Sequence, residues 1–160
     1  MIELRNNSSV KYSYDEWLEV FRENDKHRLQ IDFSQEATLS DETKALILPS
    51  ISAFQVGEHS DGLHLLKAAE AFASLFDEPA YPNVMKLFIK EENFHSSYLG
   101  EFMRYHDLPL RKSNFLDRTF RRLRRRGNIL SEVVTLITAE IIALSYYSAL
   151  SDATESPALK

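Results

Sequence analysis

Turn-forming residues are scarce in this chain, which holds four glycines and five prolines in 160 residues. A β-sandwich or β-barrel needs a turn about every 8–12 residues, so this scarcity argues against an all-β fold. Apolar residues instead recur at helical spacing nearly throughout the chain. The hydrophobic fraction of 44% is enough to form one sizeable core. The sequence therefore predicts an all-α protein of ordinary single-domain size.

Capping residues and prolines mark where we expect the helices to begin. Ser13 and Glu16 have the spacing of a capping box, the reciprocal hydrogen-bonded pair that opens a helix. Ser40 can cap a short stretch, and Pro49 suits the first turn of the main helix that follows it. The expected helices are 13–27, a first long helix over about 49–76, a second over about 82–106, a short one over 113–127 and a third long one over about 128–152.

Several classes of protein are excluded by what the chain lacks. It has no cysteine, so it forms no disulfide, thiolate zinc site or cysteine nucleophile. No uninterrupted apolar run approaches the roughly 18 residues of a transmembrane helix. The first residues lack the apolar segment of a signal peptide. We therefore expect a cytoplasmic protein.

The net charge of −5 conceals a strongly basic segment at 111–126, which has eight basic residues and one acid. The remainder of the chain is acidic, which argues against a uniformly basic nucleic-acid binder. One interpretation of the segment is a strip that binds RNA, acidic lipid headgroups or an acidic partner. The other is a solvated helix whose arginines pair with the acidic remainder of the chain. The arginines concerned are Arg121, Arg122, Arg124, Arg125 and Arg126.

A Glu-x-x-His pair, Glu92 and His95, lies inside the second long helix. Because residues three apart share a helical face, both side chains can reach one metal ion. The same spacing also occurs in pairs on the surface of a helix, and that reading stays open. The apolar neighbours on this face, which favour an inward position, are Met85, Phe88, Leu99 and Phe102.

Glu140 interrupts the apolar sequence of the third long helix. Burying an ionised carboxylate costs several kcal/mol unless a cation or strong donors meet it. Glu140 is therefore a candidate metal ligand, or else a carboxyl that is protonated or paired with an arginine. Tyr147, two turns further on, is a core residue or an outer partner of the ligands. The neighbours expected on the inward face are Val133, Leu136, Ile137, Ala143, Leu144 and Tyr147.

Glu58, in the first long helix, is a further candidate ligand. Gly57 and Gly62 lie close to it, and small residues allow close helix approach. Asp61 and His64 form a rival pair at the same spacing of three, with Asp61 near the face of Glu58 and His64 farther round the helix.

The arrangement of these residues resembles the ferritin-like di-iron carboxylate proteins. In that family a Glu from each of two helices and a Glu-x-x-His from each of the other two hold the metals inside a four-helix bundle. Glu58, Glu92, His95 and Glu140 lie at mid-helix positions, as the family's ligands do. The connection at 107–128 matches the long crossover of such a bundle. The resemblance covers about residues 45–160, which implies a ferritin-like domain over 41–160 preceded by a helical and irregular extension over 1–40.

The resemblance implies a di-iron oxidoreductase or oxygenase whose substrate the sequence does not identify. Iron is the implied metal, while manganese and zinc also suit Glu and His ligands. The resemblance makes Glu92 a bridging ligand, Glu58 and Glu140 terminal or bridging carboxylates, and His95 a ligand through one ring nitrogen. Tyr147 and Asp61 are expected as outer partners of these ligands.

The second Glu-x-x-His of the family does not occur before Lys160. Pro157 suits the first turn of a further helix. We expect the natural gene to continue with that pair, and we expect this chain to form a homo-oligomer that covers the apolar faces left by a missing fourth core helix. Two other functions remain open on sequence grounds: a non-enzymatic helical interaction module, and an RNA-binding accessory domain that uses the basic segment.

Overall fold

The computed structural model describes residues 12–59, 62–111 and 129–159. Within these residues the protein is all-α, as the sequence predicts. The expected short helix at 113–127, with its five arginines, and Asp61 lie outside the described residues. The helices are α1 (Tyr14–Lys26), α2 (Asp41–Glu58), α3 (Leu63–Phe76), α4 (Tyr81–Tyr105), α6 (Ile129–Asp152) and the 3₁₀ turn η1 (Pro157–Leu159).

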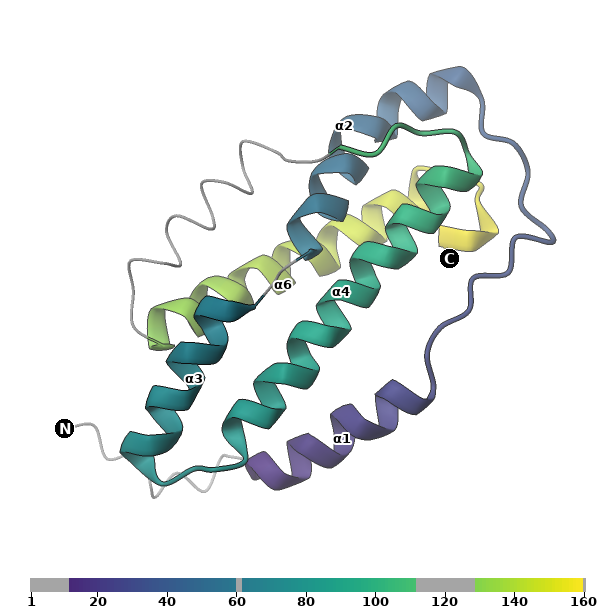
Figure 1. The fold of residues 1–160 in the computed structure, drawn as a ribbon. Helices are drawn as coiled ribbons and strands as arrows, with labels where there is room; N and C mark the ends of the chain where they lie inside the picture. The colour runs from purple at the N-terminus through teal and green to yellow at the C-terminus, as the bar shows by residue number, and fades with distance from the viewer. Residues whose placement is uncertain (1–11, 60–61, 112–128, 160) are drawn as a thin grey trace.

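Helix α4 runs through the middle of the fold, with α1 on one side and α2 and α3 on the other (Figure 1). Helix α1 begins at the predicted capping box, in which Ser13 and Glu16 exchange hydrogen bonds. It packs on α4 through ring contacts such as Phe21 on Phe88. Among the described residues, α1 thus packs mainly on α4 rather than on α6.

The first long helix expected from the sequence is two helices. Helix α2 begins at the Ser40 cap and continues through Pro49 to Glu58. Ile47 and Ile51 are both buried, and their packing on either side of Pro49 compensates for the hydrogen bond that the proline removes. A break then separates α2 from α3, and Gly62 adopts a left-handed conformation with φ of +64° at the start of α3. Glu58 consequently lies at the end of a helix, and the prediction that it lies mid-helix is wrong.

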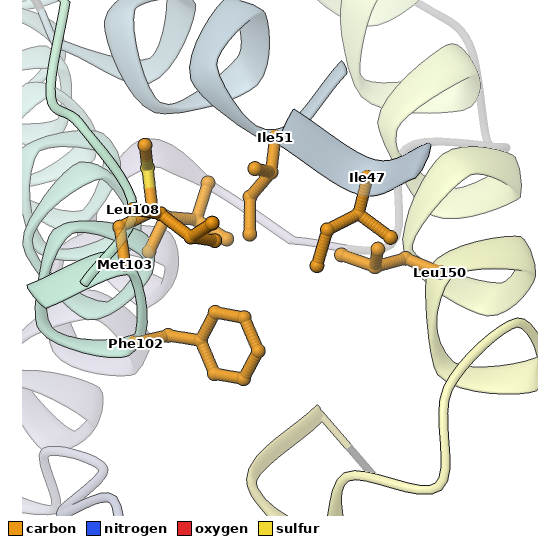
Figure 2. Close-up of a cluster of buried hydrophobic side chains, with 7 residues drawn as sticks. Ile47, Ile51, Phe102, Met103, Leu108 and Leu150 are labelled. Atoms are coloured by element: carbon orange, nitrogen blue, oxygen red, sulfur yellow. The ribbon is translucent and has the colours of Figure 1, made fainter. Parts of the chain in front are cut away.

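The main hydrophobic core joins α2, the C-terminal part of α4 and the end of α6 (Figure 2). Ile51, Phe102 and Met103 are almost wholly buried in it. This core fixes the distance between α2 and α4, which the site described below requires. Its members are Ile47, Ile51, Leu99, Phe102, Met103, Leu108 and Leu150.

A buried Glu36–His106 pair fastens the irregular segment before α2 to the end of α4. Oε1 of Glu36 lies 2.9 Å from Nε2 of His106. Its other oxygen accepts a hydrogen bond from the backbone N–H of Ala158 at 3.0 Å. Burial by itself raises the pKa of Glu36, but hydrogen bonds from Ser156, Ala158 and His106 outweigh it and lower that pKa below its usual range. The pair thus joins three segments that are distant in sequence.

Helix α6 is apolar on nearly all of its faces. It is long and apolar enough to cross a membrane by length and composition, a test that core helices of soluble proteins also pass. Ile137 and Leu144, expected on the inward face beside Glu140, are 53% and 70% exposed. That part of the prediction is wrong, because an apolar helix gives no sequence signal for which side faces its neighbours.

Replacing Gly62 with alanine should destabilise the protein, since the added Cβ would clash with the Ile89 side chain and would belong to a residue in a left-handed backbone conformation. We expect a loss of about 2–4 kcal/mol from strain and overpacking together. Urea unfolding followed by circular dichroism measures this loss. Gly57→Ala is the matched control: it adds a Cβ with no atom within 4 Å and should be neutral or stabilising by up to about 1 kcal/mol. Equal effects of the two substitutions would contradict this account of the break.

Candidate metal centre

Three of the four predicted ligands meet between α2 and α4. Glu58 at the end of α2 faces Glu92 and His95 on α4, and their ligand atoms all lie within 4.8 Å of one another. The Glu58 and Glu92 side chains are only 9% and 13% exposed, while that of His95 is 42% exposed. The two carboxyl groups of the cluster are thus shielded from solvent, whereas the imidazole is partly exposed to it.

Helix α4 provides two of these side chains because Glu92 and His95 lie three residues apart on one face. The register between α4 and α2 is set next to them by Ser96 and Gln55. The Ser96 hydroxyl donates to the backbone carbonyl of Gln55 at 2.8 Å and accepts from the Gln55 side-chain amide at 3.1 Å. Gln55 precedes Glu58 by three residues, so this buried pair places the carboxylate opposite the Glu-x-x-His.

The Glu92 carboxyl group faces Glu58 in a setting that favours its protonated form. Burial, reinforced by the charges of Glu140 and Glu58 and by a hydrogen bond with Glu58, raises the pKa of Glu92 to about 9. At neutral pH Glu92 therefore keeps its proton and donates it to Glu58. Two unprotonated carboxylates this close in an apolar setting would repel each other strongly. A proton on Glu92 removes this repulsion, and a bound cation would offset it as well.

Helix α6 adds Tyr147 and Glu140 to the surroundings of the cluster. The Tyr147 hydroxyl donates to Oε1 of Glu58 at 2.5 Å, the contact expected of an outer partner. Burial, together with the charge of Glu58, raises the pKa of this tyrosine, so it stays a donor. Glu140 is half-buried, and its pKa is raised by burial and by the charge of Glu58. It acts on the cluster through its charge but lies outside the group of three whose ligand atoms meet.

The spacing of the three ligands suits a single small cation. Nδ1 of His95 lies 3.7 Å from Oε1 of Glu92 and 3.9 Å from Oε2 of Glu58. Two ligand atoms at about 2.1 Å from one tetrahedral ion are about 3.4 Å apart, so the two distances to His95 need to close by only a few tenths of an ångström. Imidazole and carboxylate ligands suit iron, manganese and zinc. The donor set and its spacing therefore fit such an ion.

A buried Glu–His pair outside the cluster was not foreseen from the sequence. Oε1 of Glu132 on α6 lies 2.6 Å from Nδ1 of His64 on α3, and the Glu132 side chain is only 2% exposed. The inward spacing of Glu132, Leu136 and Ala143 was the signal available for it. This pair connects α6 to α3. Asp61, the partner expected for His64 in the rival ligand pair, lies outside the described residues.

A partly open cavity of about 320 Å³ reaches His95 from the side of α1. Phe21 and Phe94 contribute aromatic surface to its wall, and the guanidinium of Arg28 lies 4.0 Å from the centre of the Phe94 ring. Asp25 pairs with Lys90 at 2.7 Å across the same wall. The cavity gives small solutes a route to the exposed edge of the cluster.

No protein-family model matches the chain, and no curated protein or solved structure matches it either.

Proposed function

We propose that this protein binds one divalent transition-metal ion through Glu58, Glu92 and His95. The observation that carries the proposal is the meeting of two nearly buried carboxyl groups and an imidazole, with their ligand atoms all within 4.8 Å. A cation would displace the proton held between Glu58 and Glu92 and would leave both carboxylates ionised. Glu140 is a further carboxyl group whose electrostatic interaction reaches Glu58 and His95.

The resemblance of these residues to ferritin-like di-iron proteins supports iron as the metal and oxidation chemistry as the function. In that family the metal pair activates dioxygen or oxidises iron. The described residues supply one Glu-x-x-His and two further carboxylates, which is sufficient for one ion. The role of this chain is to hold the ion with ionised carboxylates, to keep Tyr147 protonated as a donor to Glu58, and to leave the His95 side open to the cavity.

The alternative function is a helical interaction module in which these polar side chains are hydrogen-bond partners and bind no metal. In that case the hydrogen bond from protonated Glu92 to Glu58 stabilises the two buried carboxyl groups without a metal. The two functions differ in one respect that is easily measured, because only the first requires Glu92 and His95 to act together on an added ion.

Metal affinity should collapse when a ligand is removed. Titration calorimetry with Zn²⁺ in air and with Fe²⁺ under anaerobic conditions should give close to one bound ion per chain. Removal of an outer partner of a metal site typically costs 10–100-fold in affinity, so Glu92→Gln or His95→Ala should cost at least about 100-fold.

Glu91→Gln is the matched control for this experiment. Glu91 precedes Glu92 on α4, accepts a hydrogen bond from the Asn24 side chain at 3.2 Å and is not one of the three ligands. Its charge is the smallest of the influences that raise the pKa of Glu92, so its replacement should change the affinity far less than the loss of a ligand does. Equal affinities of the native chain and of the Glu92→Gln and His95→Ala variants would remove the metal function and leave the interaction module.

Removing the hydroxyl of Tyr147 should weaken metal binding without abolishing it. That hydroxyl orients Glu58, and loss of such an outer hydrogen bond should reduce the affinity about tenfold. Tyr146→Phe provides the comparison, because Tyr146 stacks on Phe54 and its hydroxyl bonds Ser50 at 3.2 Å. A Tyr147→Phe variant with the affinity of Tyr146→Phe would show that the tyrosine has no part in the site.

A further inference from the structure

The outward side of α6 is a long apolar stripe. Five aliphatic residues along it are each 53–70% exposed, although large aliphatic side chains on a helix normally face the core. Their spacing is 4, 3, 4 and 3, which is the heptad spacing of a helix that packs along another helix. These residues, which we call the α6 seam, are Leu130, Val134, Ile137, Ile141 and Leu144.

The opposite side of α6 packs against other helices of the same chain. Glu132 lies 2.6 Å from His64 of α3, and Tyr147 bonds Glu58 of α2. Ala143 and Leu150 are buried on the same inner side. The α6 seam is therefore a separate surface, and the metal proposal does not depend on it.

The periodicity favours a helix as the occupant over a lipid bilayer. Hydrocarbon has no repeat and selects no spacing, whereas a 3.5-residue repeat is what keeps a seam facing a partner helix. Helix α6 is also attached along its inner side by two buried carboxylates, Glu132 and Glu58. Entering a bilayer would require these contacts to open.

The charge pattern favours a second copy of this chain as that helix. Between residues 129 and 149 only Glu132 and Glu140 are charged, and they are buried and half-buried, respectively. Two seams can thus approach without opposing like charges, although each whole chain carries a net charge of −5. Leu130 and Leu144 end the seam, and the β-branched Val134, Ile137 and Ile141 lie between them, which are side chains that fill the core positions of coiled coils. Ser131, Thr138 and Ser145 flank the seam and are uncharged, so nothing there selects a partner of different charge.

The area available sets the strength of such a pair. Fully burying an aliphatic side chain removes about 60–120 Å² from water. Two seams of five residues, each about three-fifths exposed, would bury roughly 400–700 Å² of apolar surface, or about 600–1,100 Å² in total at the usual apolar share of a homodimer interface. A specific interface needs about 1,000 Å². We propose that two copies of this protein pair through their α6 seams and form a dimer that dissociates on dilution.

Sedimentation velocity of the full chain over a hundredfold range of concentration tests this dimer. The native chain should shift from monomer to dimer as its concentration rises into the micromolar range, and Ile141→Glu should remain monomeric at every concentration. Leu46→Glu is the control, since Leu46 is an equally exposed (69%) leucine on α2 and lies outside the seam. Its dimerisation should match that of the native chain. A native chain that stays monomeric throughout, or equal loss of the dimer in both variants, would overturn the proposal.

The absence of cysteine allows a second test that does not require a charged substitution. Ile137 lies at the centre of the seam, so the two copies of residue 137 meet whether the helices are parallel or antiparallel. Ile137→Cys should form a disulfide-linked dimer under mild oxidation, and Leu46→Cys should not. Equal cross-linking of the two, or a monomer that floats with phosphatidylglycerol vesicles and loses this binding on Ile141→Glu, would show that the seam serves another purpose.

Discussion

Two carboxyl groups facing each other in the interior of a helical protein require either a proton or a cation between them. Glu58 and Glu92 are in this position, and the high pKa of Glu92 expresses the cost of ionising both. The other features of the site follow from this constraint. Tyr147 donates to Glu58, His95 opens toward the cavity, and Glu140 adds a further negative charge beside them. The electrostatics of the cluster and its choice of ligands therefore both support the proposed cation site.

The scaffold places these groups by a few specific contacts. The break after α2 ends that helix at Glu58 and turns the chain into α3, and Gly62 allows the close approach to Ile89 that the turn requires. Ser96 and Gln55 hold α2 and α4 in register next to the carboxylates. The core drawn in Figure 2 fixes the same two helices farther along. The turn after α2 and the packing of α2 against α4 thus together determine where Glu58 and Glu92 lie.

The sequence predicted the helices best where their starts depend on local chemistry. Ser13 and Ser40 cap α1 and α2, and Pro82 lies in the first turn of α4. The common face of Glu92 and His95 also follows from their spacing alone. The break at Gly62 did not follow, because its left-handed conformation is decided by contact with α4. Pro49 was misread as a helix start because the packing that carries α2 through it comes from other helices.

The remaining features were beyond the sequence because they depend on which side of a helix finds a neighbour. Helix α6 is apolar nearly all round, so its periodicity marks which residues share a face but not which face is inward. Glu132, which pairs with His64, lies on the inward side of α6, and the α6 seam lies on its outward side. Ile137 and Leu144 were assigned to the wrong side for this reason.

Counting the protons released when a metal binds tests the central claim most directly. Calorimetry of Zn²⁺ binding at pH 8, repeated in buffers of different ionisation enthalpy, gives this number. Because Glu92, with a pKa of about 9, is still protonated at pH 8, the bound ion should release about one proton. The number should fall as the pH rises past 9, and Glu92→Gln should release none. Binding of Zn²⁺ to the native chain at pH 8 without proton release, or no binding at all, would contradict the claim that a cation replaces the proton on Glu92.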